Sequence, residues 1–202
     1  MKKRVVIGID TSNYTTSYAI ISIDGELVAN LKRPLPVKAG ERGLRQSDAV
    51  FAHVKNLPDL ASEAKSYLED CEIVAIGVSE KPRNIEGSYM PCFLAGVAVA
   101  ENLAGALGVP LYRFSHQCGH IMAAVFSAGR FDLLEAPFAA YHVSGGTTEL
   151  LRLLAMAMAS RPSFLAVRLI LTQDRLSIES AFIWACLSPP ESILRSSRLN
   201  AQ

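Results

Sequence analysis

VVIGIDTSNYTTSYAIISIDGELVANL, residues 5–31, is the stretch of sequence that decides the fold. It starts with a β-branched run that ends at Asp10, and a second run of the same kind follows over Tyr14–Ile23. Asp24-Gly25 is a strong signal for a two-residue hairpin turn, and Glu26–Leu31 then returns as another strand. The stretch therefore predicts three antiparallel strands at the start of the chain.

Helices and strands alternate after this opening. Helices are expected over Gln46–Asn56, Pro58–Glu69, Cys92–Leu107 and Gly119–Ala128. Strands are expected over Glu72–Ser79, Leu111–Phe114, Phe138–Val143 and Thr148–Leu153. Three antiparallel strands that are extended by parallel strands through helical crossovers describe a ribonuclease-H-like core. Because this core is also one lobe of the actin-like ATPases, we predict that α/β fold with a mixed sheet.

The overall composition excludes several classes of protein. Half of the 202 residues are hydrophobic, 19% are charged and the mean hydropathy is +0.24, which excludes a disordered or coiled-coil chain. Lys and Arg (20) nearly balance Asp and Glu (19), so bulk charge favours neither a nucleic acid nor a membrane. No apolar run reaches the roughly eighteen residues of a membrane span. We therefore expect no membrane partner. The four cysteines form no CxxC pair, which predicts a reducing, cytoplasmic location.

Two polar turns follow apolar strands and could bind a ligand. Asp10-Thr11-Ser12 combines a carboxylate with two hydroxyls, groups that can hold a cation or a phosphate. Val143-Ser144-Gly145-Gly146 has two glycines, which let the backbone approach a ligand closely. Each turn alone is as well explained by an ordinary hairpin. Together they resemble the facing hairpins that hold nucleotide phosphates in actin-like proteins.

His116 and His120 form the third candidate site. If Ser115–Gly119 is helical, the two imidazoles lie one turn apart on the same face, as a bidentate metal site requires. A chance pair of histidines has the same spacing. Gln117 stands where a zinc peptidase would carry its general base, so a peptidase is disfavoured. From the residues alone, His53 and His142 are interpreted as structural or surface residues and not as catalytic ones.

Five segments together resemble the Gcp-like (glycoprotease-like) family, and they span about residues 4–153. They are Gly8–Thr16, Ile73–Ser79, Ala95–Gly108, Pro110–His120 and Phe138–Leu151, the last with the motif VSGGTTELL. This family contains the transferase subunit that makes threonylcarbamoyladenosine on tRNA. The HxxxH motif followed by VSGG and a threonine is its most specific part.

The resemblance implies an actin-like fold of two lobes, of which this chain would hold the N-terminal one. It implies one divalent metal ion, iron or zinc, held partly by His116 and His120. The residues His142, Val143, Ser144, Gly145 and Gly146 would contact a threonylcarbamoyl-adenylate or an ATP-like nucleotide. The implied reaction transfers the threonylcarbamoyl group to adenosine in the anticodon loop of tRNA, with further proteins of the modification complex as partners.

Two departures from the family pattern favour a divergent paralogue. Glu80–Gly87 replaces a Gly-Pro-Gly segment, and Ala39–Gln46 replaces a Gly-Gly-Val-Val-Pro-Glu stretch. Two alternatives therefore stay open, a non-catalytic actin-like scaffold and a glycoprotease-type metallopeptidase.

The composition changes near residue 154. Residues 155–202 contain no Gly, Lys, Tyr or His, whereas about three glycines would be expected there. Synonymous codons for residues 167–180, read from the preceding third base, encode TLDLNAGQIIDRV, and family members carry a segment close to GGTLDLNAGQ. We therefore hypothesise a frameshift near Arg152–Ala155, a lobe over residues 1–153 and a non-native, irregularly packed tail over 154–202. The alternative is a helical, Arg-rich appendage. The nucleotide sequence would decide between them.

Overall fold

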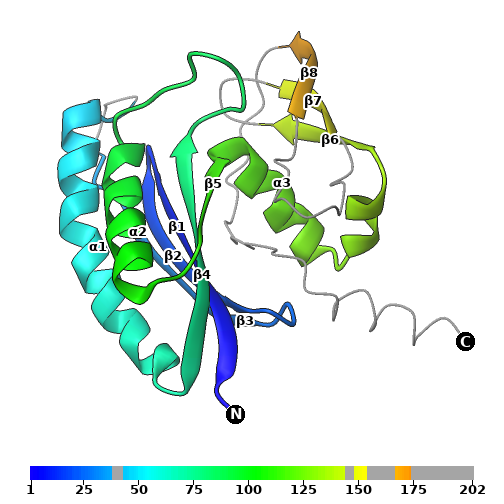
Figure 1. Cartoon of the computed structure of the whole chain (residues 1–202). Helices are drawn as coiled ribbons and strands as arrows, with labels where there is room; N and C mark the ends of the chain where they lie inside the picture. Colours follow the sequence, from blue (N-terminus) through cyan, green and yellow to red (C-terminus); the bar gives the residue numbers. More distant parts are fainter. Residues whose placement is uncertain (38–42, 144–147, 154–166, 174–202) are drawn as a thin grey trace, which may run out of the picture.

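The computed structural model describes residues 1–37, 43–143, 148–153 and 167–173, which form two sheets with helices around them (Figure 1). The larger sheet has the strand order β3-β2-β1-β4-β5 and the smaller one β6-β7-β8. The strands of the larger sheet are β1 (Lys3–Ser12), β2 (Thr15–Ser22), β3 (Leu27–Pro34), β4 (Cys71–Lys81) and β5 (Leu111–Ser115). The other elements are α1 (Gln46–Leu68), α2 (Phe93–Leu107), α3 (His116–Ser127), a 3-10 helix (Phe131–Glu135), β6 (Phe138–Val143), β7 (Thr148–Leu153) and β8 (Val167–Gln173).

The strand directions of the larger sheet confirm the predicted ribonuclease-H-like fold. β1 pairs antiparallel with β2, and β2 pairs antiparallel with β3. β4 lies parallel to β1 and β5 parallel to β4, with α2 as the crossover between β4 and β5. Since parallel strands end at the same edge, the carboxyl ends of β1, β4 and β5 meet there. Ligands of open α/β sheets bind outside this edge.

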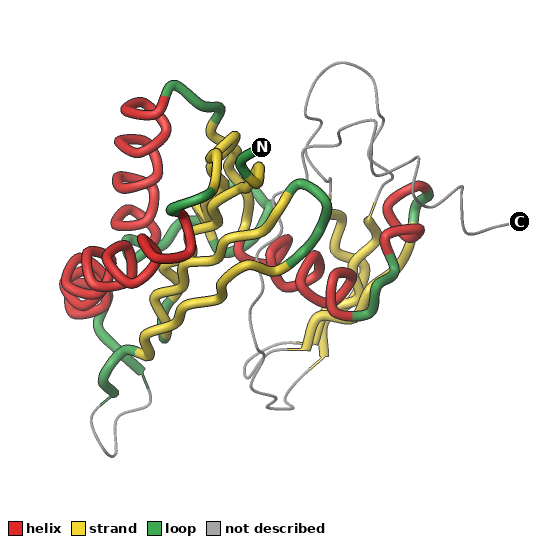
Figure 2. The backbone as a smooth tube through the Cα atoms, turned by 90° about the horizontal axis from the view of Figure 1, so that it is seen from below, coloured by secondary structure: helices red, strands yellow, loops and turns green. Residues whose placement is uncertain are grey.

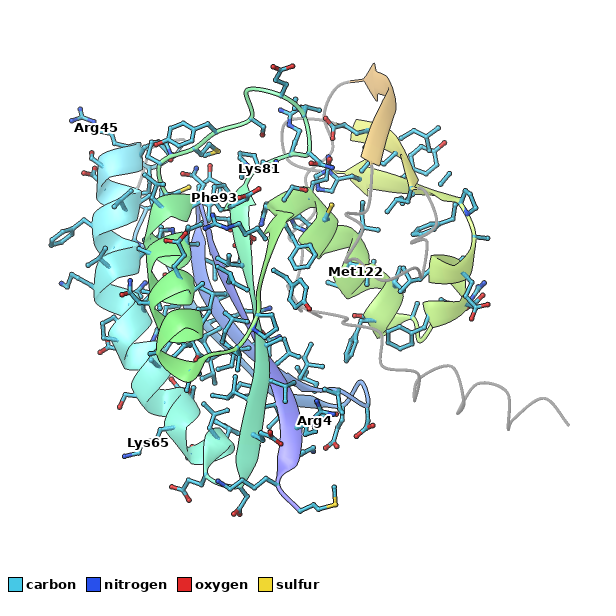
Figure 3. All side chains as sticks on the ribbon, in the orientation of Figure 1. Arg4, Arg45, Lys65, Lys81, Phe93 and Met122 are labelled. Carbon is cyan, nitrogen blue, oxygen red and sulfur yellow. The ribbon has the colours of Figure 1, made fainter. Side chains whose placement is uncertain are left out.

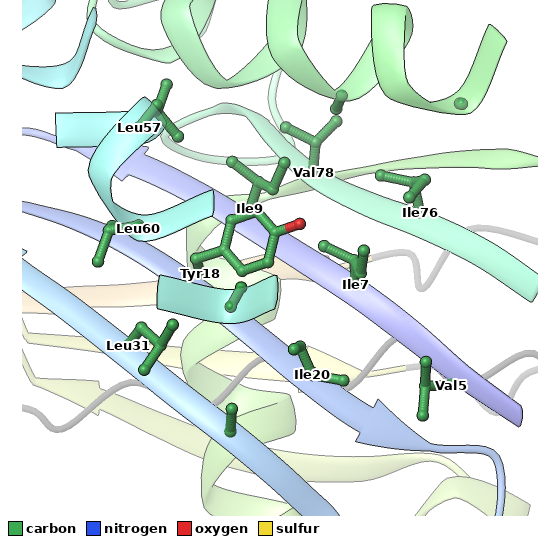
Figure 4. Packing of buried hydrophobic residues seen from close by; sticks show 14 of the residues in the cluster. Val5, Ile7, Ile9, Tyr18, Ile20, Leu31, Leu57, Leu60, Ile76 and Val78 are labelled. Carbon is green, nitrogen blue, oxygen red and sulfur yellow. The ribbon is translucent and has the colours of Figure 1, made fainter. Parts of the chain in front are cut away.

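α1 and α2 cover one face of the larger sheet (Figure 2). Their buried side chains meet those of β1, β2 and β4 in the main hydrophobic core, which Figure 4 shows from close by. Ile7, Ile9, Ile20, Leu60 and Ile76 are all fully buried in it. Truncating one such side chain to alanine typically costs about 2–5 kcal/mol, so this core holds the site-bearing strand ends in place.

α1 corrects one expectation, because the predicted break between Asn56 and Pro58 is wrong. The helix is continuous from Gln46 to Leu68 and carries Pro58 inside it. Pro58 removes the hydrogen bond to the carbonyl of Val54. Both residues are exposed, so water can satisfy that carbonyl, while Leu57 and Leu60 are buried on the other face. Packing of the apolar face therefore outweighs the local cost of proline.

The smaller sheet packs on α3 through Ile121, Leu151 and Leu153, which form a small core of their own. Its third strand, β8, belongs to the segment that we expected to pack irregularly. This run, VRLILTQ, has the composition of a strand and pairs antiparallel with the edge of β7. The remaining residues of 154–202 lie outside the described residues, so the frameshift hypothesis and the boundary at residue 153 stay predictions. Within the described ranges, no helix has the length and apolar character needed to cross a bilayer.

Candidate functional site

The candidate site lies at the carboxyl edge of the larger sheet, where β1 and β4 end and α3 begins. Figure 3 marks this end of the sheet by Lys81, the last residue of β4, and Phe93, the first of α2. The Phe93 ring lies 5.9 Å from the His116 ring, measured between ring centroids. α2, α3 and the strand ends therefore surround the same small region.

Asp10 is the buried acidic centre of this region. Its side chain is 1% exposed and accepts three hydrogen bonds. The backbone N–H of Ser12 donates to Oδ1 at 2.9 Å, and the hydroxyl of Ser79 donates to Oδ2. The ring nitrogen Nδ1 of His116 lies 2.8 Å from Oδ2. Three elements of the fold, β1, β4 and α3, thus meet on one carboxylate.

The pKa of Asp10 lies below its ordinary value of 3.8. Burial by itself raises this pKa, because it disfavours the charged form. The charge of His116 and the hydrogen bonds from His116, Ser79 and Ser12 outweigh burial and lower the pKa. Asp10 is therefore a carboxylate at neutral pH and accepts the proton of His116 Nδ1 in a hydrogen bond.

His116 and His120 lie one helical turn apart on α3, as their spacing predicts. The helix starts at His116, and the hydroxyl of its N-cap residue Ser115 accepts a hydrogen bond from the N–H of Cys118 at 3.2 Å. The two Nε2 atoms lie 3.1 Å apart. If each stood at the usual distance of about 2.0–2.1 Å from one ion, they would subtend about 98°. This angle lies between the octahedral and tetrahedral values, so the pair fits a shared metal ion.

The surroundings keep His120 neutral. Burial, the charge of His116 and that of His142 together lower the pKa of His120 to about 3. A neutral imidazole is the form that binds a metal. A third protein ligand was not found: the described part of the chain contains no group of three His, Cys, Asp or Glu side chains that could hold a metal ion. The ligand roles of His116 and His120 stay a prediction.

Thr11 and Ser12, the other two residues of the predicted phosphate turn, have structural contacts. The hydroxyl of Thr11 donates to the carbonyl of Cys92 at 3.0 Å and accepts from the N–H of Gly96 at 3.1 Å. A Cβ at Gly96 would stand 2.7 Å from this hydroxyl, so only glycine fits there. Thr11 therefore fastens α2 to β1, and Ser12 supports Asp10 through its backbone.

The second predicted turn is only partly described. His142 lies in β6 with its ring 5.1 Å from the ring of His120, between centroids, so it belongs to the same region. Burial lowers the pKa of His142, as it does for His53. Val143 ends β6, and Ser144, Gly145 and Gly146 lie outside the described residues. His53 is buried in α1 with Nδ1 2.8 Å from the Thr16 hydroxyl, and it interacts electrostatically with Asp10.

Glu149 is a site residue that the sequence reasoning missed. It is 1% exposed and lies between Arg83, Gln117 and His142. Nη1 of Arg83 lies 3.0 Å from Oε1 of Glu149, and Nε2 of Gln117 donates to Oε2. A signal was present in the sequence, since Glu149 shares the inward face of β7 with Leu151 and Leu153. A charged residue on a buried strand face usually has a partner.

Comparisons with known proteins identify the family. The model of the TsaD family, described as tRNA N6-adenosine threonylcarbamoyltransferase, matches residues 37–158, which is more than half of the chain. The chain belongs to the TsaD family. The resemblance seen in the sequence is thereby confirmed, and the family is one of acyltransferases.

Two curated members of the TsaD family show how much of such a protein is present. The chain is 30% identical over 154 residues to the enzyme of Streptococcus pneumoniae strain Hungary19A-6. It is 32% identical over 152 residues to that of Streptococcus suis strain 05ZYH33. In both comparisons the match covers 74% of this chain and 43% of the relative. The chain thus spans less than half of the length of these relatives.

Solved structures with a related arrangement have low similarity. YeaZ from Pseudomonas aeruginosa superposes with a TM-score of 0.42 at 16% identity, covering 87% of this chain and 73% of that one. A Ppx/GppA family member from Aquifex aeolicus gives 0.40 at 18% identity, covering 86% and 51%. The fold assignment therefore depends on the strand order and directions of the larger sheet.

Proposed function

We propose that this chain is the N-terminal lobe of a tRNA threonylcarbamoyltransferase, or of a close paralogue. The reaction would transfer the threonylcarbamoyl group from its adenylate to the N6 amine of an adenosine in the anticodon loop of tRNA. Family membership supports the reaction class. The observation that carries the proposal to this site is the convergence of the two Nε2 atoms of His116 and His120, 3.1 Å apart, beside buried Asp10.

His116 and His120 would hold an iron or zinc ion, which as a Lewis acid would polarise a carbonyl or phosphate oxygen of the substrate. Asp10 keeps the proton of His116 on Nδ1, so that Nε2 presents its lone pair. Residues 142–146 would contact the adenylate. Because glycine has no Cβ, the backbone of this segment would approach the ligand closely, and its N–H groups would bind developing negative charge.

The proposal limits what the chain does alone. Since it spans 43% of the length of its curated relatives, groups from the remaining part of such a protein would be absent. Two protein ligands hold a catalytic metal weakly, because such sites usually have three. We therefore expect the 202-residue chain to bind a metal weakly and to have no transferase activity on tRNA by itself.

Metal binding distinguishes the proposal from a scaffold role. Zinc and ferrous iron would be titrated calorimetrically into the chain, with His116→Ala and His120→Ala as variants and His142→Gln as the matched control. The proposal expects one site that either alanine variant abolishes and His142→Gln retains. A chain in which neither metal binds even weakly, at concentrations far above those that fill a three-ligand site, would support the non-catalytic scaffold and overturn the transferase proposal. Binding of a threonylcarbamoyl-adenylate analogue, measured in parallel, tests the substrate class.

In the described part of the chain, the position after His116 that would carry the general base of a peptidase is occupied by glutamine. This residue, Gln117, cannot take up a proton usefully, and its amide donates to Glu149. Glu149 is itself held by Arg83. Hydrolysis of a protein substrate by the metal-loaded chain, lost in His120→Ala, would reverse this conclusion.

A further inference from the structure

The two imidazoles His116 and His142 have chemically different partners on the same ring atom. Nδ1 of His116 lies 2.8 Å from Oδ2 of Asp10, and a carboxylate only accepts hydrogen bonds. His116 therefore carries its proton on Nδ1, and its Nε2 lone pair faces Nε2 of His120 at 3.1 Å, where the proposed metal would bind. For His142, Oε2 of Glu149 lies 3.7 Å from Nδ1 and affects the ring electrostatically, whereas an amide nitrogen, Nε2 of Gln117, lies nearer at 3.4 Å.

A chain of contacts from Arg83 to Gln117 fixes the orientation of that amide. Arg83 is half-exposed and pairs with Oε1 of Glu149 at 3.0 Å, so the buried carboxylate has a countercharge. Oε2 of Glu149 accepts a hydrogen bond from the side chain of Gln117. Because a carboxylate cannot donate, the nitrogen of the Gln117 amide, and not its oxygen, faces Glu149. The backbone N–H of Gln117 also donates to the carbonyl of Pro82 at 3.0 Å, which holds the residue in place.

The oriented amide determines the proton position on His142. Nε2 of Gln117 lies 3.4 Å from Nδ1 of His142, whereas Oε2 of Glu149 lies 3.7 Å away, beyond hydrogen-bond distance. The second hydrogen of the amide therefore points to Nδ1, which accepts it. A neutral imidazole has one N–H, so that of His142 must be on Nε2.

We propose that Arg83, Glu149 and Gln117 are positioning residues that hold His142 as an Nε2–H donor for an oxygen of the bound substrate, a phosphate or a carbonyl. His142 is then a substrate-binding group and not a metal ligand, although it adjoins the metal-binding pair. Its ring lies 5.1 Å from that of His120, and its side chain is 16% exposed, which leaves it accessible from one side. The inference rests on the proposed function for the identity of the substrate, while its test does not use activity.

Nitrogen NMR of the metal-free chain reads the proton position directly. The chain has four histidines, so long-range proton–nitrogen spectra contain four ring patterns, and His142→Gln identifies the one from His142. The expected wild-type pattern has the proton of His142 on Nε2 and that of His116 on Nδ1. A proton on Nδ1 of His142 would overturn the proposal.

Two variants test the contact chain. In Gln117→Leu the amide is gone while Oε2 of Glu149 stays near Nδ1 of His142, so the proton should move to Nδ1 and the pattern should reverse. In Glu149→Leu the amide is free to turn, and a mixture of both forms is expected. Gln46→Leu, which removes a hydrogen-bonded glutamine elsewhere, should leave the pattern unchanged. An unchanged His142 pattern in Gln117→Leu, or in Glu149→Leu if the former does not fold, would overturn the positioning role.

Small probes test the donor role and identify the oxygen. AMP, adenosine and N-carbamoylthreonine would be added separately to the same sample. A shift of the Nε2–H signal with AMP but not with adenosine assigns the donor to the phosphate, and a shift with N-carbamoylthreonine assigns it to the carbonyl. No shift with any probe would overturn the donor role. Zinc titration of the same sample shows separately whether the proposed metal function fails.

Discussion

The site contains two carboxylate–histidine regions, the first formed by Asp10 with His116 and the second by Glu149 with His142. They differ in one intervening group. Both carboxylates are 1% exposed. Asp10 contacts the ring of His116 directly, whereas Glu149 meets that of His142 mainly through the amide of Gln117. The first arrangement leaves a lone pair on Nε2 and the second leaves an N–H there. A carboxylate and an imidazole can therefore provide a metal ligand in one place and a hydrogen-bond donor in the other.

The largest expected effect is on metal affinity, and it comes from a substitution in the first region and not from one in the second. Asp10→Asn removes the charge that makes His116 a strong ligand, and loss of such a partner typically lowers metal affinity about 10–100-fold. Glu149→Gln should change the affinity less than about twofold, because His142 is not a ligand in our proposal. Zinc titration of both variants checks this difference. Equal losses would show that the two regions are not separate.

Gly96→Ala tests whether the contact between α2 and β1 supports the first region, without changing any of its charged groups. The added methyl group would lie 2.7 Å from the Thr11 hydroxyl and would push β1 and α2 apart. Overpacking of this kind costs about 1–3 kcal/mol. Urea unfolding measures the cost, with Gly105→Ala as the matched control, since its Cβ would meet nothing within 4 Å. A destabilisation no larger than that of the control would contradict the contact.

Acid should weaken both regions together. His120 in the unfolded chain takes up a proton near its ordinary pKa of 6.5, whereas in the folded chain its pKa is about 3. The unfolded state therefore binds more protons below pH 6.5, and stability is lost as the pH falls from about 6.5 toward 3. His142 and His53 shift in the same direction.

The slope due to His120 is at most about 1.4 kcal/mol per pH unit. Unfolding of the metal-free chain at pH 7, 6 and 5 measures it, and His120→Gln should reduce it. A stability that rises between pH 6 and pH 5 would have the wrong sign.

Arg83→Met should have the smallest effect and should touch only the second region. It leaves Glu149 buried with the amide of Gln117 as its remaining close donor. Because Arg83 is half-exposed and its charge is screened, we expect a loss well below the roughly 3–5 kcal/mol that removing one partner of a fully buried pair costs. Lys65→Met on the outer part of α1 is the matched control. Unfolding experiments at two salt concentrations check whether the loss has an electrostatic origin.

The sequence allowed the first region to be predicted much better than the second. Asp10 follows a β-branched strand, and His116 and His120 have helical spacing, so local patterns indicated all three. Glu149 and Arg83 are 66 positions apart, and no local pattern joins them. The alternation of β7 indicated that Glu149 is buried, but only the packing of the loop after β4 against that strand supplies its partner. The predicted helix break before Pro58 was wrong for a similar reason, since tertiary packing outweighed a local signal.

β5 ends at Ser115 and α3 starts at His116, without a linker between them. His116 is therefore at the pivot between the larger sheet and the helix that carries the smaller one. A helix of 12 residues is about 18 Å long, so a rotation of about 10° at this pivot would move its far end by about 3 Å. Since His116 stands at the junction and His120 one turn further along, both would move far less than the end of the helix.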